Sequence, residues 1–239
     1  MIGTGRHGCT IVGPMRKGAV PATRAGLEKL YDRLLKHFGH AGWWPGETAF
    51  EVCVGAILTQ NTSWTNVEKA LGALRQRDLL SAPKLRAVPV SRLARMIRSS
   101  GYFNVKARRV RSFLDFLHRE YGGRVEGMTR EDPWELRAKL LTVDGIGRET
   151  ADSIVLYAAG HPLFVVDAYT RRIFARLDLV DGGAPYDAIQ RFFMERLPLN
   201  APLYNDFHAQ VVRLGKDICR PRPRCDACPL ETLCPKHGV

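Results

Sequence analysis

Helical periodicity is the feature that most limits what this chain can fold into. Between residues 23 and 38, the apolar residues Leu27, Leu30 and Leu34 recur three or four positions apart. This is the spacing of one face of a helix, with Thr23 suited to cap its start and Gly39 to end it. Further helices are predicted at 50–58, 64–75, 91–99, 105–121 and 133–141.

Glycine and proline divide the predicted helices. The breaks fall at Pro83, Pro89, Gly101, Gly122, Gly123 and Gly160. No segment shows the strict apolar–polar alternation of a half-buried β-strand. The sequence therefore predicts an all-α fold.

Length and composition indicate a folded protein without a membrane segment. The chain has 239 residues, of which 45% are hydrophobic and 25% charged, enough for one large or two small domains with a real core. It contains no stretch of about 20 apolar residues and no apolar segment after its basic N-terminus, so we expect neither a membrane span nor a secretory signal. A cytoplasmic protein is expected, associated with the nucleoid if the source is bacterial.

The charge favours a polyanionic partner. The formal net charge is +12 and the isoelectric point is about 9.7. Nucleic acid is the commonest partner for such a surplus, and a merely basic soluble protein is the alternative. A membrane-surface protein is less favoured, because no basic amphipathic segment stands apart from the predicted helices.

Residues 140–158 form the most informative segment. A helix is expected to end near Val143 and another to begin near Arg148, joined by a turn containing Gly145 and Gly147. Glycines allow positive φ angles and a close approach of backbone to a ligand, and Ile146 between them is expected to anchor the turn in the core. Such a hairpin can hold a nucleic-acid phosphate without recognising sequence. A plain helical connection is the alternative.

An acidic residue follows a buried apolar run at 164–166 and precedes a basic helix. This residue, Asp167, is suited to cap that helix. A carboxylate in this place could also stabilise positive charge on a sugar or activate water as a glycosidic bond breaks. The two roles are compatible.

Four of the six cysteines lie within sixteen residues, and Cys9 and Cys53 stand apart. The four are Cys219, Cys225, Cys228 and Cys234. In an intracellular protein such a cluster indicates metal ligation more than disulfides. An iron–sulfur cluster and zinc both accept four thiolates, but zinc modules usually have two short Cys-x2-Cys pairs and this chain has one.

A proline-stiffened basic loop lies between the first two of these cysteines. Its sequence is Arg-Pro-Arg-Pro-Arg, from 220 to 224. We expect Arg222 and Arg224 to contact DNA phosphates. A solvated basic loop is the alternative.

Taken together, these motifs resemble one family in their order and spacing. The segment 101–107, the hairpin, the run VVDAYTRR and the four cysteines are similar to those of endonuclease III, a helix-hairpin-helix DNA glycosylase, over residues 25–235. The resemblance implies double-stranded DNA with damaged or mismatched bases as partner, a catalytic acid at Asp167 and a [4Fe–4S] cluster on the four cysteines. It also implies a monomer.

The resemblance implies two helical domains flanking a DNA groove. A flexible basic tail is expected at 1–22 and a helical barrel with the hairpin at 42–160. The second domain would combine 23–41 with 161–239. The expected DNA contacts from the hairpin are Gly145, Ile146, Gly147, Arg148 and Thr150.

The hairpin departs from the family at a position that carries chemistry. Members that also cleave the strand have a lysine where this chain has Glu149. That lysine attacks the sugar and forms a Schiff base, which neither a carboxylate nor the protonated Arg148 can do. A hydrolytic, monofunctional DNA glycosylase is therefore predicted. A glycosylase with AP lyase activity and a damaged-DNA-binding protein with weak catalysis are the alternatives. Asp144 also replaces a proline common in the family.

Two further segments bear on how DNA would be held. Residues 56–62 resemble the family's wedge loop, which fills the hole left by a flipped base; either Gln60 or Asn61 could supply the wedge. Trp43 and Trp44 resemble those of related enzymes that remove alkylated purines, because indoles stack well on cationic bases. The alternative is that both tryptophans are core residues.

Overall fold

The computed structural model describes residues 20–40 and 42–239. Positions 1–19 of the predicted tail, including Cys9, therefore lie outside the described residues. Helices and turns account for all the regular structure within the described ranges, without a β-strand. The all-α prediction is confirmed. No helix of the described chain is both long and apolar enough to cross a membrane.

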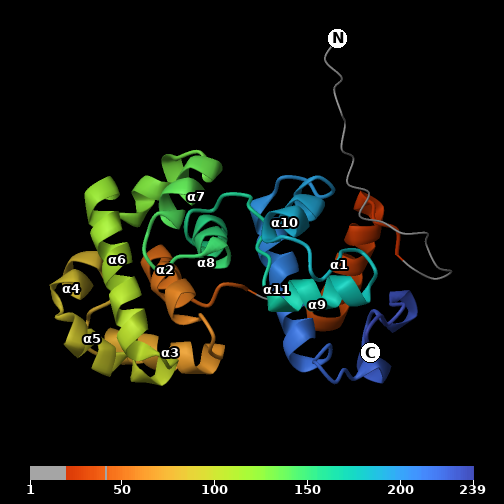
Figure 1. Ribbon diagram of the computed structural model, residues 1–239, viewed down its shortest axis with the longest axis horizontal. Coiled ribbons are helices and arrows are strands. Elements are labelled where there is room, and N and C mark those ends of the chain that lie inside the picture. Colours follow the sequence, from red (N-terminus) through yellow and green to blue (C-terminus); the bar gives the residue numbers. More distant parts are fainter. Residues whose placement is uncertain (1–19, 41) are drawn as a thin grey trace, which may run out of the picture. The chain divides into compact units, whose positions relative to one another are not determined.

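The chain folds into two compact units (Figure 1). Of the described residues, unit 1 comprises 20–40, 166–198 and 206–239, and unit 2 comprises 42–165 and 199–205. The chain passes from unit 2 to unit 1 at 165–166 instead of the expected 160–161. One reason is that Phe164 is fully buried and packs edge-on against Tyr204 of the same unit, with ring centroids 5.4 Å apart.

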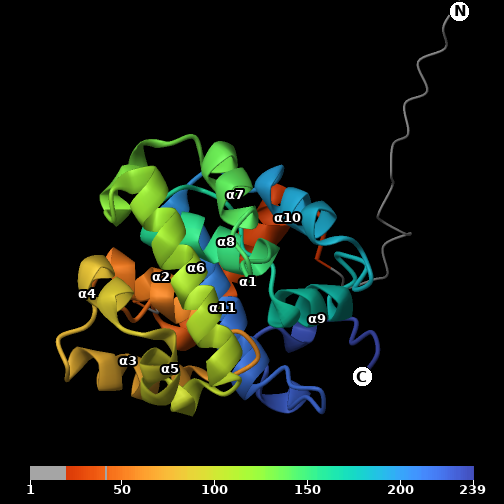
Figure 2. The same ribbon diagram turned by 60° about the vertical axis from the view of Figure 1, so that its left-hand side comes forward.

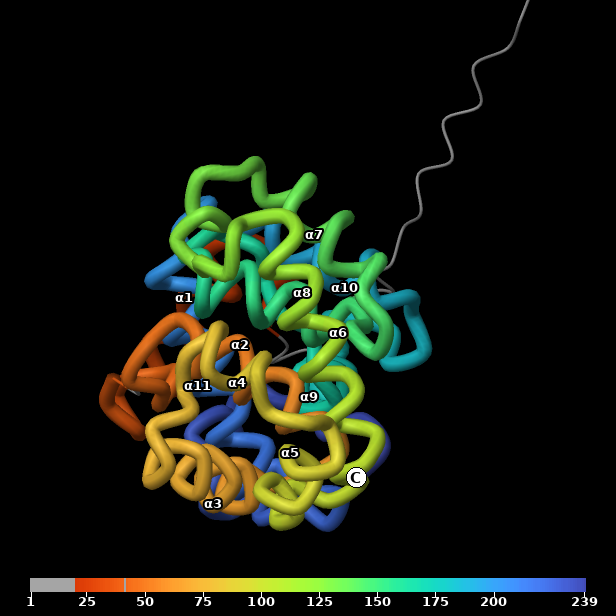
Figure 3. Tube along the Cα trace, turned by 90° about the vertical axis from the view of Figure 1, so that its left-hand side faces the viewer, coloured from red at the N-terminus to blue at the C-terminus, as the bar shows by residue number. Residues whose placement is uncertain are grey.

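Unit 2 is built from helices and helical turns around one buried helix, α2. Its elements are α2 (Ala49–Leu58), α3 (Trp64–Arg75), α4 (Ala82–Ala87), α5 (Val90–Met96), η1 (Arg98–Ser100), α6 (Phe103–Tyr121), η2 (Val125–Arg130), α7 (Pro133–Leu141), α8 (Arg148–Ser153) and the π-helical turn η3 (Ile154–Ala158). Helix α6 is the long helix that α2, α4 and α5 pack against (Figures 1 and 2). Figure 3 shows α3 and α5 side by side.

Helix α2 is buried along its length. Every residue from 50 to 58 is buried, and the helix contacts α3, α6, α8 and η3. A helix that is apolar on all faces belongs in a core. Its one buried charge, Glu51, is paired with Arg75 at 2.9 Å, as a buried carboxylate requires.

Unit 1 combines both ends of the described chain. Its helices are α1 (Arg24–Phe38), α9 (Ala168–Arg176), α10 (Tyr186–Met194) and α11 (Ala201–Asp217, of which 201–205 belong to unit 2), followed by the short turns η4 (Cys225–Ala227) and η5 (Glu231–Leu233). Its core is aromatic: Phe193 packs edge-on against Phe174 at 4.6 Å and against Phe207 at 6.4 Å.

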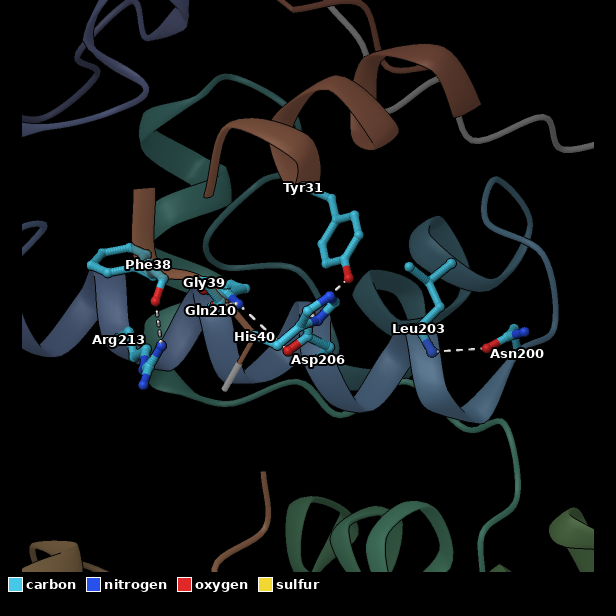
Figure 4. A network of polar contacts seen from close by, with 9 residues as sticks. All are labelled: Tyr31, Phe38, Gly39, His40, Asn200, Leu203, Asp206, Gln210 and Arg213. Carbon is cyan, nitrogen blue, oxygen red and sulfur yellow. Dashed lines mark hydrogen bonds and ion pairs between the residues drawn. The ribbon is translucent and has the colours of Figure 1, made fainter. Parts of the chain in front are cut away.

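Polar contacts attach the end of α1 to α11 (Figure 4). Tyr31 donates to Asp206 Oδ2 at 2.7 Å, and burial together with this carboxylate raises the pKa of the phenol. Gln210 and Arg213 donate to the backbone oxygens of the last turn, at 2.7 and 3.0 Å. These carbonyls have no partner within α1 itself, so the side chains of α11 satisfy them.

Most predicted helices are present, with differences near prolines. Helix α1 has Thr23 as its N-cap, accepting from Gly26 N, and Gly39 as its C-cap, as predicted. Pro83, expected to be a break, instead lies in the first turn of α4. A backbone N–H in the first turn has no intrahelical acceptor, so proline, which lacks that N–H, is tolerated there. The helix predicted at 91–99 is split into α5 and the 3-10 turn η1.

A buried lysine connects two segments of unit 2. Lys106 is 1% exposed, and its Nζ donates to Leu58 O at 2.9 Å and to Ser100 O at 2.5 Å. Burial, with a smaller contribution from the charge of Arg109, lowers the pKa of this ammonium to about 8.

This pKa predicts how stability depends on pH. The folded chain loses the proton near pH 8, whereas an unfolded lysine keeps it to about pH 10.5, so stability should rise as pH increases through this window. We expect the free energy of unfolding to rise by on the order of 1–3 kcal/mol, and by less at the upper end of the window, where tyrosines begin to ionise. Urea unfolding between pH 7.5 and 9.5 measures it. Lys106→Met should abolish the rise and the exposed Lys69→Met should keep it; parallel curves for wild type and Lys106→Met would contradict this assignment.

Candidate functional site

The predicted hairpin is present in unit 2. Helix α7 ends at Leu141 and α8 begins at Arg148, joined by a turn in which Ile146 is 5% exposed. Its burial confirms the predicted anchoring of the turn. Arg148 and Glu149 are exposed on the first turn of α8. The hairpin is supported by an ion pair between Arg137 of α7 and the fully buried Asp152 of α8, at 2.7 Å.

The two hairpin glycines have different roles. Gly145 has a φ of +82°, and a Cβ placed there would lie 2.2 Å from Arg109 Cγ. Gly147, expected to share the positive φ, has a φ of −92° instead and is the extended N-cap of α8. Any residue can adopt that conformation, and a Cβ there would meet no atom. Gly147 therefore leaves its exposed backbone uncovered, whereas Gly145 is required by conformation and packing.

The predicted wedge loop, 56–62, begins within α2, which ends at Leu58, and its remaining residues, 59–62, lie against the hairpin. Gln60 Nε2 donates to Gly145 O and to Thr150 Oγ1, both at 2.9 Å, and Gln60 Oε1 accepts from Arg109 Nη1. The next residue, Asn61, is exposed and has a φ of +53°. Asparagine tolerates this left-handed conformation better than most residues. The two amides proposed for the wedge thus differ in surroundings, one bonded inward and the other facing solvent.

Three tryptophans form an aromatic cluster in the same unit. The ring of Trp44 meets that of Trp64 edge-on at 5.1 Å, and Trp43 lies 5.5 Å from Trp44. Tyr157, which the π-helical turn η3 carries, lies 5.1 Å from Trp44. The three indole N–H groups are buried and have no hydrogen-bond partner among the described residues. An unpaired buried donor is costly unless a ligand or water satisfies it.

Glycine in α2 makes room for this cluster. A Cβ at Gly55 would lie 3.3 Å from Trp44 Nε1 and 3.6 Å from the ring of Trp64. Glycine inside a helix costs about 1 kcal/mol relative to alanine. Here the missing side chain lets two indoles approach the buried helix.

The cluster borders an open pocket of about 530 Å³. The residues lining it are Gly42, Trp44, Pro45, Gly46, Glu47, Trp64, Glu68, Leu71 and Arg75. The lining carries two carboxylates, Glu47 and Glu68, and one guanidinium, that of Arg75. Arg75 pairs with Glu47 at 3.3 Å and also with the buried Glu51. The pocket thus combines indole surfaces with a negative charge balance, which suits a flat cation.

In unit 1, Asp167 is the N-cap of α9. Its Oδ1 accepts from Thr170 N at 2.7 Å and from Thr170 Oγ1 at 2.9 Å. Its Oδ2 lies 3.6 Å from Nε2 of His208 on α11, and the Asp167 side chain is 12% exposed. The capping role predicted for Asp167 is confirmed, and its second oxygen lies beside a histidine.

His208 is a neutral partner for this carboxylate. It is 5% exposed, and burial lowers the pKa of its imidazole more than the charge of Asp167 raises it. The close approach of α9 to α11 brings the two together: a Cβ at Gly215 would lie 2.4 Å from the ring of Tyr169. Arg172 of α9 also donates to Gly215 O at 2.9 Å. His208 carried no sequence signal, because its partner lies 41 residues away in the chain.

The four clustered cysteines of unit 1 line one small cavity of about 30 Å³. Within the described residues, no set of three or more His, Cys, Asp or Glu side chains is arranged to hold a metal ion. The four thiols nonetheless face the same space, and burial raises the pKa of Cys228 to about 11 and raises that of Cys234. Four sulfurs spread around a cavity suit a cluster, in which each iron takes one thiolate.

Arg176, at the end of α9, holds the loop that begins at Cys219. Its Nη1 donates to Cys219 Sγ at 3.3 Å and to Arg220 O at 2.6 Å, and its Nη2 donates to Pro221 O at 3.0 Å. The loop is therefore ordered by backbone contacts. Arg222 and Arg224 are both exposed on it, and Arg224 also donates to Asp217 O at 3.0 Å.

The structure brings some predicted residues together and adds others. In unit 2 the loop residue Gln60 contacts the hairpin at Gly145 and Thr150; in unit 1 the cysteines share a cavity. Thr150, a predicted DNA contact, is buried with its hydroxyl accepting from Gln60. Sequence reasoning missed Arg109 and Trp64. A third tryptophan twenty residues after Trp44 was the available signal for the second of these.

Comparison with known proteins gives consistent matches. A model of the HhH-GPD superfamily of base excision DNA repair proteins matches residues 54–199. A candidate DNA repair glycosylase of Methanocaldococcus jannaschii is 45% identical over 209 residues, covering 87% of this chain and 95% of the relative.

Two solved structures have a similar fold. A non-covalent endonuclease III–DNA complex superposes with a TM-score of 0.75 at 24% identity, covering 90% of this chain and 96% of the other. An H. pylori 3-methyladenine DNA glycosylase bound to 1,N6-ethenoadenine superposes with a TM-score of 0.65 at 29% identity, covering 81% and 95%.

The two environments of the Asp167 carboxylate predict different effects for two substitutions. Asp167→Asn keeps an oxygen that can accept from Thr170, so the free energy of unfolding should change by less than about 0.5 kcal/mol. Asp167→Ala removes the cap and should cost about 1 kcal/mol. Urea denaturation of the two variants measures the difference. Equal loss in both would contradict the capping geometry.

Proposed function

The chain belongs to the HhH-GPD superfamily of base excision DNA repair proteins, and we propose that it is a monofunctional DNA glycosylase for cationic, alkylated bases. Its substrate would be double-stranded DNA, bound by a monomer in the cytoplasm. Water would displace the base from C1′ of the sugar, leaving a free base and an abasic site in an unbroken strand.

Hydrolysis without strand cleavage is supported by one residue, Glu149. It occupies the hairpin position at which lyase members of the family have the Schiff-base lysine. A carboxylate cannot form an imine with the sugar. Arg148 beside it stays protonated and is no substitute.

The geometry of Asp167 supports its role in the reaction. One oxygen is held by Thr170, which fixes the orientation of the carboxylate without protonating it. The other oxygen, beside neutral His208, remains to face positive charge that develops on the sugar or to take a proton from the attacking water. A fixed carboxylate in a place with little solvent is effective because it needs no reorganisation during the reaction.

The tryptophan pocket supports the substrate class. A positively charged purine stacks more strongly on indole than a neutral one, and Glu47 and Glu68 add to this preference. A cationic base leaves the sugar as a neutral molecule, so no acid has to protonate it. The similar H. pylori 3-methyladenine DNA glycosylase, with its bound ethenoadenine, supports the same class.

DNA would be held through phosphates. We propose that the exposed backbone at Gly147, with the half-buried turn at Gly145 and the side chain of Arg148, contacts one strand, and that Arg222 and Arg224 contact phosphates elsewhere. The net charge of +12 is consistent with affinity that falls as salt increases.

We propose that Cys219, Cys225, Cys228 and Cys234 hold a [4Fe–4S] cluster. The shared cavity and the four soft sulfur ligands fit such a group. Its contribution would be structural, because it would join the start and end of the loop that carries Arg222 and Arg224. Arg176 would support the same loop through its bonds to Cys219 Sγ and the following carbonyls.

The cluster predicts a coloured protein. Wild-type protein purified without oxygen should contain four irons and four sulfides and absorb visible light; Cys228→Ala should lose the absorption and most of the iron, because one ligand is removed. Cys53→Ala, which alters a buried cysteine of unit 2 outside the cavity, should keep both. Metal and sulfide analysis makes the measurement. A colourless protein containing zinc would reject the cluster.

The activity is tested by single-turnover base release from duplexes containing 3-methyladenine, 7-methylguanine, uracil, a thymine mismatch, an oxidised pyrimidine, or adenine opposite oxidised guanine. We expect release of the cationic bases at least about tenfold faster than the others, with strand breaks only after alkali, and no turnover by Asp167→Asn. Breaks without alkali would indicate a lyase. No release from any duplex would favour a damaged-DNA-binding protein.

A pair of tryptophan variants tests the pocket in the same assay. Trp44→Leu should slow release of the cationic bases by about tenfold or more and leave any slow release of neutral bases unchanged. Trp134→Leu is the matched control, because Trp134 is half-exposed on α7 and stacks only on Arg137 among the described side chains. Equal effects of the two variants would remove the pocket from base recognition.

A further inference from the structure

We propose that Gln60 is a positioning residue, which fixes the loop carrying Asn61 against the hairpin, and that Arg109 holds Gln60 in place. The inference rests on the proposed function, in which this loop enters DNA from which a base has been turned out. It assigns the insertion to Asn61 and the alignment of the loop to Gln60.

All the polar atoms of the Gln60 side chain are engaged within unit 2. The amide has two N–H donors, which go to Gly145 O and Thr150 Oγ1 at 2.9 Å each. Its oxygen accepts from Arg109 Nη1. Only an amide supplies two donors and an acceptor together. Turning Gln60 outward would leave Gly145 O, the Thr150 hydroxyl and the guanidinium without these partners, at a cost that grows with burial.

Arg109 is fixed by packing as well as by its hydrogen bond. A Cβ at Gly145 would lie 2.2 Å from Arg109 Cγ, 2.5 Å from Cδ and 2.7 Å from Nε. The side chain of Arg109 therefore lies directly on the hairpin glycine, and its guanidinium cannot leave Gln60 without moving away from the turn. The absence of a side chain at position 145 is what permits this contact.

The same face of α6 supports the loop at a second point. Lys106, one turn before Arg109, donates to Leu58 O at the end of α2. Residues three apart on a helix are neighbours. Leu58 and Gln60 are thus held from one helix, and the chain between and just beyond them has little freedom. This leaves Asn61 exposed with a φ of +53°, a conformation that persists where the surroundings determine it.

This arrangement explains how the loop and the hairpin can act together. A phosphate held at the hairpin turn would fix the DNA relative to Gly145, and Gln60 would fix Asn61 relative to the same glycine. Insertion then needs no separate ordering of the loop, which lowers the entropy cost of binding damaged DNA. Undamaged duplex, which presents no hole, would gain nothing from the alignment.

The test uses a duplex with a tetrahydrofuran abasic analogue opposite 2-aminopurine and an undamaged duplex of the same sequence. Affinity for both is measured, together with 2-aminopurine fluorescence as a sign of insertion. Asn61→Ala should lower the preference for the abasic duplex about tenfold and lose the fluorescence change, with affinity for undamaged duplex unaltered. Gln60→Ala and Arg109→Met should lower the same preference, and Gln60→Ala with Asn61→Ala should be no worse than either alone.

Two further variants separate positioning from folding. Gln60→Glu keeps an acceptor for Arg109 but has no donors, so it should also lose the preference, while the exposed Gln76→Ala should behave as wild type. If Gln60→Ala does not fold, Arg109→Met, which keeps Gln60 itself, gives the answer.

Three results would overturn the proposal. In the first, the preference for the abasic duplex survives both Gln60→Ala and Arg109→Met. In the second, these variants lower the affinity for both duplexes equally, and Gln60 is then only a support of the hairpin. In the third, the preference for the abasic duplex is lost in Gln60→Ala but kept in Asn61→Ala, and Gln60 is then the inserting residue. Because the analogue cannot be cleaved, these results do not depend on base release, whose absence would reject the proposed function alone.

Discussion

The burial of α2 on every side is the constraint on which unit 2 depends. A short apolar helix contributes stability only if other helices cover it, and α3, α6, α8 and η3 do so. Its features then determine the functional surfaces around it. Gly55 admits the indoles of Trp44 and Trp64, and the carbonyl of Leu58 at its end is held by Lys106. The pocket and the loop after α2 are therefore positioned by the same rigid element, as a site built on a packed helix requires.

Helix α11 has the corresponding role in unit 1. Asp206, Gln210 and Arg213 of α11 bind α1 and the residues just after it, and these bonds fix α11 in unit 1. His208, which lies between them in the chain, faces Asp167 instead. Gly215 lets α9 approach closely enough for that contact. A carboxylate at a helix N-terminus is common and needs no further explanation. What distinguishes Asp167 is that only one of its oxygens caps the helix, while the other meets a neutral imidazole in a place with little solvent.

The sequence predicted what depends on local pattern and missed what depends on distant partners. Periodicity and caps were sufficient for α1 and the helices of the hairpin, and the fold class followed. Pro83 was misassigned because proline interrupts a helix interior but is tolerated in its first turn. Gly147 was expected at positive φ because glycines in turns often are, yet capping α8 requires extended backbone. Arg109 and His208 could not be found, since each acquires its role from residues about forty or more positions away.

Hydrogen-bond saturation distinguishes residues that support a site from residues available to a ligand. Gln60 and Asn61 are adjacent amides of similar chemistry, and counting positions along the chain cannot separate them. The structure does, because every donor and acceptor of Gln60 is used within unit 2, whereas Asn61 faces solvent. The tryptophans present the converse case: their indole donors are buried, yet no described residue accepts from them. A buried donor without a partner lowers stability unless something binds it. The folding of unit 2 therefore leaves the chemistry of these indoles unsatisfied, whereas it uses the amide of Gln60 in full.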